Sequence, residues 1–186
     1  MPLSFIFETA LGFVAISWGE RGLTRLVLPQ TTRAAAGRGL ARTGPAAPPI
    51  ASETELPPEI AALVAAIRRY AQGEQTDFSA VPVDLSGVDD FRRDIYAAAR
   101  RLEHGHVVTY GELAALAGHP GAARETGAAL GSNPVPLVIP CHRIVAAGGR
   151  LGGFSAPGGN ATKARLLAHE RARFPAADPA QASFAF

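Results

Sequence analysis

Three short helical segments separated by glycines, in the second half of the chain, restrict its fold more than any other feature. The spacing of apolar residues predicts one helix over about 89–102. A capping-box pattern, Thr109 with Glu112, begins a second helix over 110–116, and a third extends over about 122–130. Two short helices joined by a glycine-containing turn are typical of a helix-turn-helix and equally of an ordinary helical hairpin.

The third predicted helix has an unusual surface for a protein that reads DNA sequence. Alanine and glycine make up most of it, and Arg124 is its main projecting side chain. Recognition helices in the major groove normally carry several polar side chains that contact base edges. A smooth helix with one arginine suits a protein that rotates a nucleotide out of the duplex, with the arginine entering the base stack. Packing against neighbouring helices is the other explanation for the alanines.

The first half of the chain reads as a scaffold without a catalytic constellation. Residues 4–28 contain three apolar runs joined by short glycine-containing connections, which predicts an antiparallel meander. The Ala, Gly, Pro and Arg of residues 31–58 predict a loop. A helix is predicted over 58–72, and a further short strand over 81–85.

The chain has one cysteine, Cys141, which lies between Pro140 and His142. A single cysteine excludes an internal disulfide and any zinc site with two or more thiolates. The prolines that precede it, from Asn133-Pro134-Val135-Pro136 onward, favour a stiff and extended approach. A thiol held beside an imidazole can become a reactive thiolate. A small buried hydrophobic residue is the alternative interpretation of a lone cysteine.

Composition and charge point to a globular protein whose second half is the more basic. Of the 186 residues, 47% are hydrophobic and 18% are charged, which is sufficient for a real core. Residues 1–85 carry 7 Arg and 8 acids, 7 − 8 = −1, whereas residues 86–186 carry 11 Lys and Arg and 8 acids, 11 − 8 = +3. No signal peptide or membrane span is predicted, so a cytoplasmic protein is expected.

Several motifs in the second half resemble the O6-alkylguanine-DNA alkyltransferase family, also called methylated-DNA–protein-cysteine methyltransferases. The most specific is Pro140-Cys141-His142-Arg143 preceded by Asn133-Pro134, and the whole match covers about residues 88–171. The other matching segments are Thr109-Tyr110-Gly111-Glu112-Leu113-Ala114, Ala122-Ala123-Arg124, Gly127, Gly152-Gly153-Phe154-Ser155, Lys163, Leu166-Leu167 and Glu170.

The resemblance implies an α+β fold with two domains. Residues 1–85 would form a small ribonuclease-H-like sheet-and-helix domain, with 31–57 as a loop. Residues 86–175 would form a winged helix-turn-helix-like domain, followed by a tail over 176–186.

The resemblance also implies a chemistry. In this family an alkyl group passes from O6 of guanine directly to a cysteine sulfur, which makes Cys141 the nucleophile. His142 would be the base, acting through a bridging water, and Glu170 would orient its imidazole. Tyr110 would donate to N3 of guanine, and Asn133 would brace the turn ahead of the cysteine. Because the thioether product is stable, each molecule would act once.

The implied substrate pocket contains Ser155 near O6 and the backbone carbonyl of Ile144, which would accept the exocyclic amine of guanine. Gly153, Phe154 and Lys163 complete it, with Phe154 at a position where tyrosine is frequent.

On the DNA side, Arg124 would fill the space left in the base stack. The other implied DNA-binding residues are Thr109, Ala122, Ala123 and Gly127. The implied partner is double-stranded DNA containing O6-alkylguanine, bound by a monomer without a cofactor. The structural zinc of some members is not expected, because no cysteine precedes Cys141 and no histidine precedes His104.

Three other functions compete with this one. A non-catalytic alkyltransferase-like protein would bind the same lesions, but such proteins usually carry tryptophan at the cysteine position. A helix-turn-helix regulator would read sequence without covalent change. A cysteine hydrolase would turn over esters or peptides.

Overall fold

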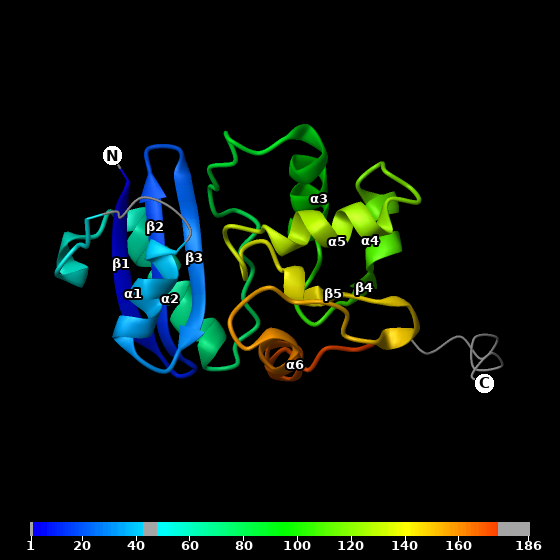
Figure 1. The fold of residues 1–186 in the computed structure, drawn as a ribbon. Coiled ribbons are helices and arrows are strands. Elements are labelled where there is room, and N and C mark those ends of the chain that lie inside the picture. Colours follow the sequence, from blue (N-terminus) through cyan, green and yellow to red (C-terminus); the bar gives the residue numbers. More distant parts are fainter. Residues whose placement is uncertain (1, 43–47, 175–186) are drawn as a thin grey trace. The chain divides into compact units, whose positions relative to one another are not determined.

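The computed structural model describes residues 2–42 and 48–174, which form a mixed α/β protein with a small antiparallel sheet (Figure 1). This confirms the α+β prediction at that level. The chain divides into two compact units, Met1–Gly87 with Pro134–Val138 and Val88–Asn133 with Ile139–Phe186. The predicted tail over 176–186 lies outside the described residues.

The sheet of the first unit is the predicted antiparallel meander, in the order β1-β2-β3. Its strands are β1 (Leu3–Thr9), β2 (Gly12–Gly19) and β3 (Gly22–Gln30). The register aligns Ile6 with Ala15 and Ala15 with Val27, so these side chains form a row on one face. Phe7 follows Ile6 and therefore points to the other face.

Helix α1 (Arg33–Ala41) covers the face with Ile6 and Val27, where a loop was predicted. The prediction was wrong: Thr32 caps the helix by accepting from Ala35 N at 3.1 Å, and the helix is further stabilised by packing against the sheet. A Cβ at Gly39 would lie 2.7 Å from a Val27 methyl, and one at Gly37 would lie 3.4 Å from Ile6 Cδ1. The glycines that suggested a loop are thus what lets the helix approach the strands.

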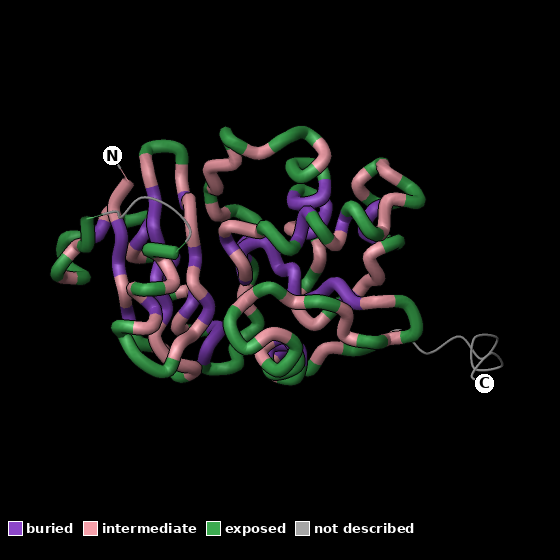
Figure 2. The backbone as a smooth tube through the Cα atoms, viewed as in Figure 1, coloured by how far each residue is buried: buried purple, intermediate pink, exposed green. Residues whose placement is uncertain are grey.

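Helix α2 (Pro58–Ala71) contacts the opposite face, as the guanidinium of Arg68 lies 5.6 Å from the centre of the Phe7 ring. This helix agrees with the predicted one. With helices on both faces, the middle of β2 is buried without alternation (Figure 2).

The predicted strand over 81–85 is reduced to one bridge, between Val83 and Leu23. Leu23 donates its N–H to the carbonyl of Pro82 at 2.8 Å. Asp84 N donates in return to the Leu23 carbonyl at 2.9 Å, but Pro82 has no N–H with which to extend the ladder towards residue 80.

The second unit contains the three helices predicted for this region and one more. They are α3 (Asp90–Arg100), α4 (Tyr110–Leu116), α5 (Ala123–Gly131) and α6 (Gly159–His169). The predicted capping box begins α4: Thr109 Oγ1 accepts from Glu112 N at 3.2 Å, and Glu112 Oε2 accepts from Thr109 N at 2.6 Å. Tyr96 on α3 donates its hydroxyl to the carbonyl of Ala129 on α5, at 2.8 Å and in the interior.

A short parallel pairing positions the cysteine segment beside the start of α4. Strand β4 (Val108–Thr109) pairs with β5 (Ile144–Val145), which directly follows a single 3-10 turn, Cys141–Arg143. None of the helices in the described part of the chain is long and apolar enough to cross a membrane.

Residues 134–138 leave the second unit and join the first. The carbonyl of Pro134 accepts a hydrogen bond from Leu26 N on β3, at 3.0 Å. The side-chain amide of Asn133 donates to the carbonyl of Ile139 at 2.8 Å, which closes the base of this excursion. The chain thus returns to the second unit just ahead of Cys141.

Candidate active site

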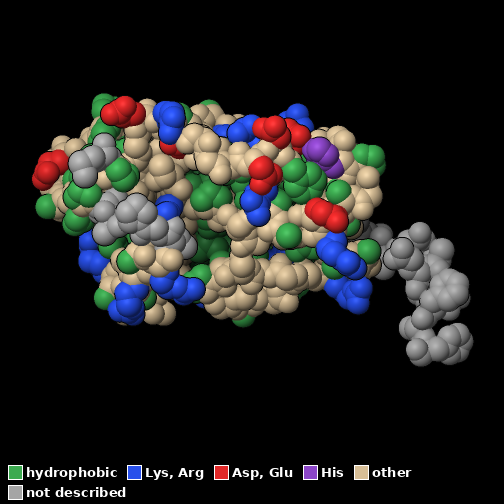
Figure 3. Space-filling view, turned by 45° about the horizontal axis from the view of Figure 1, so that its top comes forward, with side chains coloured by type: hydrophobic (Ala, Val, Ile, Leu, Met, Phe, Trp, Pro, Cys, Tyr) green, Lys and Arg blue, Asp and Glu red, His purple; other side chains and the backbone are tan. Residues whose placement is uncertain are grey.

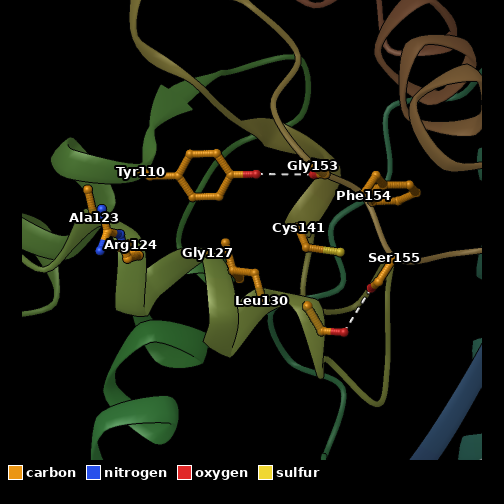
Figure 4. A pocket seen from close by; sticks show the side chains of 10 residues that line it. Tyr110, Ala123, Arg124, Gly127, Leu130, Cys141, Gly153, Phe154 and Ser155 are labelled. Atoms are coloured by element: carbon orange, nitrogen blue, oxygen red, sulfur yellow. Dashed lines mark hydrogen bonds between the residues drawn. The ribbon is translucent and has the colours of Figure 1, made fainter.

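A pocket of about 550 Å³ in the second unit is built from α5, the start of α4 and the loop after β5 (Figure 4). Its lining includes several of the residues predicted for the site. These are Tyr110, Ala123, Arg124, Gly127, Cys141, Gly153, Phe154 and Ser155. Leu130 and Gly131 also line it and were not predicted, although they lie on the same face of α5 as Ala123, Arg124 and Gly127.

Cys141 contributes a largely buried thiol to this pocket, with 9% of the residue exposed. Burial raises the pKa of the thiol, while a hydrogen bond with the Asn133 side chain and the charge of Lys163 oppose that rise. The resting thiol is therefore protonated at neutral pH, and its use as a nucleophile requires a base.

His142 and Glu170 lie buried behind the cysteine and do not line the pocket. His142 Nε2 lies 2.7 Å from Glu170 Oε1, and His142 Nδ1 has no hydrogen-bond partner among the described residues. Burial lowers the pKa of His142, Arg143 and Lys163 lower it further, and Glu170 opposes them. The imidazole is thus neutral at rest. An ionised Glu170 accepts the proton of Nε2, which leaves the lone pair of Nδ1 able to take a proton.

Burial alone would raise the pKa of Glu170, but hydrogen bonds and charges from His142 and Arg143 outweigh it and hold that pKa well below its usual range. Arg143 Nε and Nη2 reach Glu170 at 2.8 and 3.0 Å. No role was predicted for Arg143 from the sequence, although it lies within the most specific motif.

The two predicted proton donors of the pocket already donate hydrogen bonds to backbone carbonyls. Tyr110 donates its hydroxyl to the Gly153 carbonyl at 3.1 Å, and Ser155 donates to the Gly131 carbonyl at 2.8 Å (Figure 4). Burial raises the pKa of Tyr110, and the electrostatic effect of Cys141 raises it further. The Tyr110 hydroxyl therefore stays protonated and able to donate.

Gly152 permits the close approach of the loop to Tyr110. Its φ is +71°, and a Cβ there would lie 2.9 Å from Tyr110 Cε2. On the other side of the ring, a Cβ at Gly127 would lie 3.7 Å from Tyr110 Cε1. The tyrosine ring therefore lies between two glycines, of which Gly152 is the one that the close approach of the backbone requires.

Lys163 and Ile144 do not line the pocket but are linked beneath it. Lys163 is fully buried, and its Nζ donates to the Ile144 carbonyl at 2.5 Å. Burial lowers the pKa of Lys163 to about 8. The ammonium also lies 5.6 Å and 5.9 Å from the ring centres of Tyr110 and Phe154. Lys163 thus supports the pocket wall from behind.

Four of the predicted DNA-binding residues lie around the beginnings of α4 and α5, and Gly127 lies in the middle of α5. Thr109 and Ala122 are the N-caps of these helices, and the exposed Arg124 lies at the far end of the pocket from Ser155 (Figure 4). On the face in Figure 3, acidic and basic side chains of this unit are interspersed, so the described residues form no continuous basic patch in that view.

Within residues 2–42 and 48–174 no group of three or more His, Cys, Asp or Glu side chains is arranged to bind a metal ion.

Residues 90–172 match the family model described as 6-O-methylguanine DNA methyltransferase, DNA binding domain. A methylated-DNA–protein-cysteine methyltransferase from Mycolicibacterium paratuberculosis is 42% identical over 123 residues, which cover 66% of this chain and 72% of that protein. A protein of the same name from Mus musculus is 37% identical over 173 residues, covering 89% and 79%.

Solved structures are similar over nearly the whole chain. The Mycobacterium tuberculosis O6-methylguanine methyltransferase superposes with a TM-score of 0.72 at 31% identity, covering 97% of this chain and 99% of the other. A Mycobacterium tuberculosis OGT in complex with DNA gives a TM-score of 0.70 at 32% identity, covering 93% and 95%.

Proposed function

This chain belongs to the methylated-DNA–protein-cysteine methyltransferase family, and from that premise we propose that it repairs DNA by irreversible alkyl transfer from O6-alkylguanine to Cys141. Its partner is double-stranded DNA that contains the lesion, and it acts as a cytoplasmic monomer without a cofactor. The ribonuclease-H-like description of residues 1–85 and the winged helix-turn-helix description of residues 86–175 are part of the same proposal.

The arrangement behind the cysteine is the observation that carries the proposal. Cys141 opens into the pocket, and the buried His142–Glu170 pair lies behind it, with no described residue hydrogen-bonded to Nδ1 of the histidine. A thiol whose pKa is raised by burial needs such a base, and a neutral imidazole oriented by a carboxylate is a suitable one.

The transfer step is a single displacement. The proton of Cys141 passes through a water molecule to His142 Nδ1, and the sulfur attacks the alkyl carbon. The S–C bond forms as the C–O6 bond breaks, and the electron pair of the broken bond goes to guanine. Tyr110 gives its hydroxyl proton to N3 of the departing base and regains one from the His142 side. The net products are a cysteine thioether and guanine.

The pocket donors support the departure of guanine. Tyr110 and Ser155 each face the pocket with a hydroxyl, and preorganised donors stabilise negative charge as it develops. When the base enters, these hydroxyls exchange their backbone partners, the carbonyls of Gly153 and Gly131, for guanine. Since water does not hydrolyse a thioether, each molecule completes one transfer.

The base reaches the pocket by rotation out of the duplex. The face of α5 that lines the pocket consists mostly of small residues, so DNA can approach it closely. Arg124 is exposed at the opposite end from Ser155, where it enters the base stack in place of the extruded nucleotide.

The test is intact-protein mass spectrometry after incubation with duplex DNA that carries one O6-methylguanine, followed by peptide mapping. We expect the mass to increase by one methylene on the Cys141 peptide and to saturate at one equivalent. Cys141→Ala should gain nothing while still retarding the lesion duplex in a gel. Retardation by the wild-type protein without any mass gain would instead indicate the non-catalytic lesion-binding function.

A further inference from the structure

Arg143 is a buried arginine whose side chain is fully engaged, and the mechanism above does not use it. It is 5% exposed. Its Nε and Nη2 donate to the two oxygens of Glu170, at 2.8 and 3.0 Å, and its Nη1 donates to the Leu102 carbonyl at 2.6 Å. The guanidinium therefore joins the cysteine turn to the C-cap of α6 and to the chain after α3.

The Glu170 carboxylate is held from several directions at once. Oε1 is shared between His142 Nε2 and Arg143 Nη2, and Oε2 accepts from Arg143 Nε and from the N–H of Gly105, at 3.1 Å. A planar guanidinium that binds both oxygens fixes the plane of the carboxylate as well as its position, which a lysine does not do.

The protonation state of Glu170 determines which nitrogen of His142 carries the proton. An ionised carboxylate only accepts, so His142 Nε2 must be protonated and Nδ1 keeps its lone pair. A protonated Glu170 could instead donate to Nε2, which would place the imidazole proton on Nδ1. In that tautomer His142 cannot take the proton of Cys141, and transfer stops.

We propose that Arg143 is a positioning residue for alkyl transfer, because its fork holds Glu170 as a pure acceptor and thereby keeps the lone pair of His142 Nδ1 available to the thiol. This inference rests on the proposed function and assigns a role within the same site. Arg143 acts through Glu170 and His142 and does not contact the reacting atoms.

The charges around the pair predict how the loss of Arg143 changes the pH dependence. His142 faces Glu170, Arg143 and Lys163, and Glu170 also faces His104. Arg143 lowers the pKa of His142 as well as that of Glu170. Without this cation both groups bind protons more readily, so the acid limb of the rate profile moves to higher pH.

The experiment compares Arg143→Met, Arg143→Lys and Arg165→Met with the wild-type protein. Arg165 is an exposed arginine on α6, the helix that ends at Glu170, and it serves as the matched control. Alkylation of Cys141 by iodoacetamide is followed by intact mass from acid to alkaline pH, which reports thiolate formation without DNA. Single-turnover transfer from the O6-methylguanine duplex is measured over the same range, and circular dichroism at each pH establishes that the variants are folded.

For Arg143→Met we expect both rates to fall about tenfold to a hundredfold at neutral pH, as for other residues that orient a ligand or base, and to recover as pH rises. Arg143→Lys, which keeps a cation but loses the fork, should show a smaller shift of the acid limb in the same direction, and Arg165→Met should match the wild type. A folded Arg143→Met with an unmoved profile would overturn the proposal, even if its rate fell uniformly.

If Arg143→Met does not fold, Arg143→Lys decides the question. A loss of rate that is greatest at acid pH supports the role, whereas wild-type rates at every pH refute it. A shifted iodoacetamide profile in the variant, combined with no transfer from DNA by the wild type, would retain the role of Arg143 and reject the proposed function.

Discussion

Replacing Gly152 with alanine should distort the contact between the loop and Tyr110, and its cost can be divided into two terms. The first is conformational, since a φ of +71° costs a residue with a Cβ about 1–2 kcal/mol. The second is steric, because the new Cβ would lie 2.9 Å from Tyr110 Cε2 and 3.1 Å from its hydroxyl oxygen. The Tyr110 hydroxyl is also tied to this loop by its hydrogen bond to the Gly153 carbonyl, so we expect overpacking to add about 1–3 kcal/mol.

Gly149 provides a matched control for the first term. Its φ is +73°, and nothing lies within 4 Å of a Cβ built there. Gly149→Ala should therefore cost only about 1–2 kcal/mol, whereas Gly152→Ala should reach about 2–5 kcal/mol, the sum of both terms.

The assay is urea unfolding of both variants followed by far-UV circular dichroism, together with single-turnover transfer from the O6-methylguanine duplex. Where the loop relaxes to relieve the contact, the stability loss shrinks and the transfer rate falls instead, because Tyr110 is displaced. The reasoning is refuted if Gly152→Ala is no less stable than Gly149→Ala and also transfers at the wild-type rate.

Three further predictions concern the DNA contact, the buried carboxylate and the start of α4. Arg124→Ala should slow transfer from duplex DNA and leave reaction with the free alkylated base unchanged; equal loss on both substrates in a single-turnover assay would exclude the proposed role in extrusion. Glu170→Gln should cost about 3–5 kcal/mol at neutral pH because Arg143 loses its charged partner. Folding lowers the pKa of Glu170, so the stabilisation by its carboxylate is complete above the ordinary glutamate pKa of about 4.3 and is lost progressively below it. The difference in melting temperature between Glu170→Gln and the wild type should therefore narrow as pH falls. A difference that stays constant with pH would contradict this. Thr109→Ala should cost about 1 kcal/mol by removing one half of the capping box, and an unchanged urea midpoint would show that the cap contributes nothing.

Local patterns predicted the parts of the fold that depend on local interactions. The capping box at Thr109 and the three strands of the meander depend on residues close together in the sequence, and both form as predicted. Helix α1 was missed because its glycines make sense only once the sheet is present for them to approach. The strand over 81–85 was overestimated because Pro82 cannot donate to a ladder.

In the candidate site, too, some features could be predicted from the sequence and others depend on how the chain folds. The family resemblance assigned Tyr110, Cys141 and Ser155 to the site, and these residues line one pocket. The separation of roles within the Cys141–Arg143 turn could not be read from the sequence, because it depends on where Glu170 lies after folding. Lys163 was expected to face the substrate, yet its ammonium is directed to the Ile144 carbonyl, since a buried cation needs an acceptor close by.

The excursion of residues 134–138 means that neither unit is continuous along the chain. A fragment that begins at Val88 would retain these residues without the β3 strand whose Leu26 donates to Pro134, and Cys141 follows only a few residues later. The part of the chain from Val88 onward is therefore not an independent folding unit. Chimaeras between relatives should transplant 134–138 together with the N-terminal half, and a boundary drawn at residue 87 alone would pair the cysteine approach of one protein with the sheet of another.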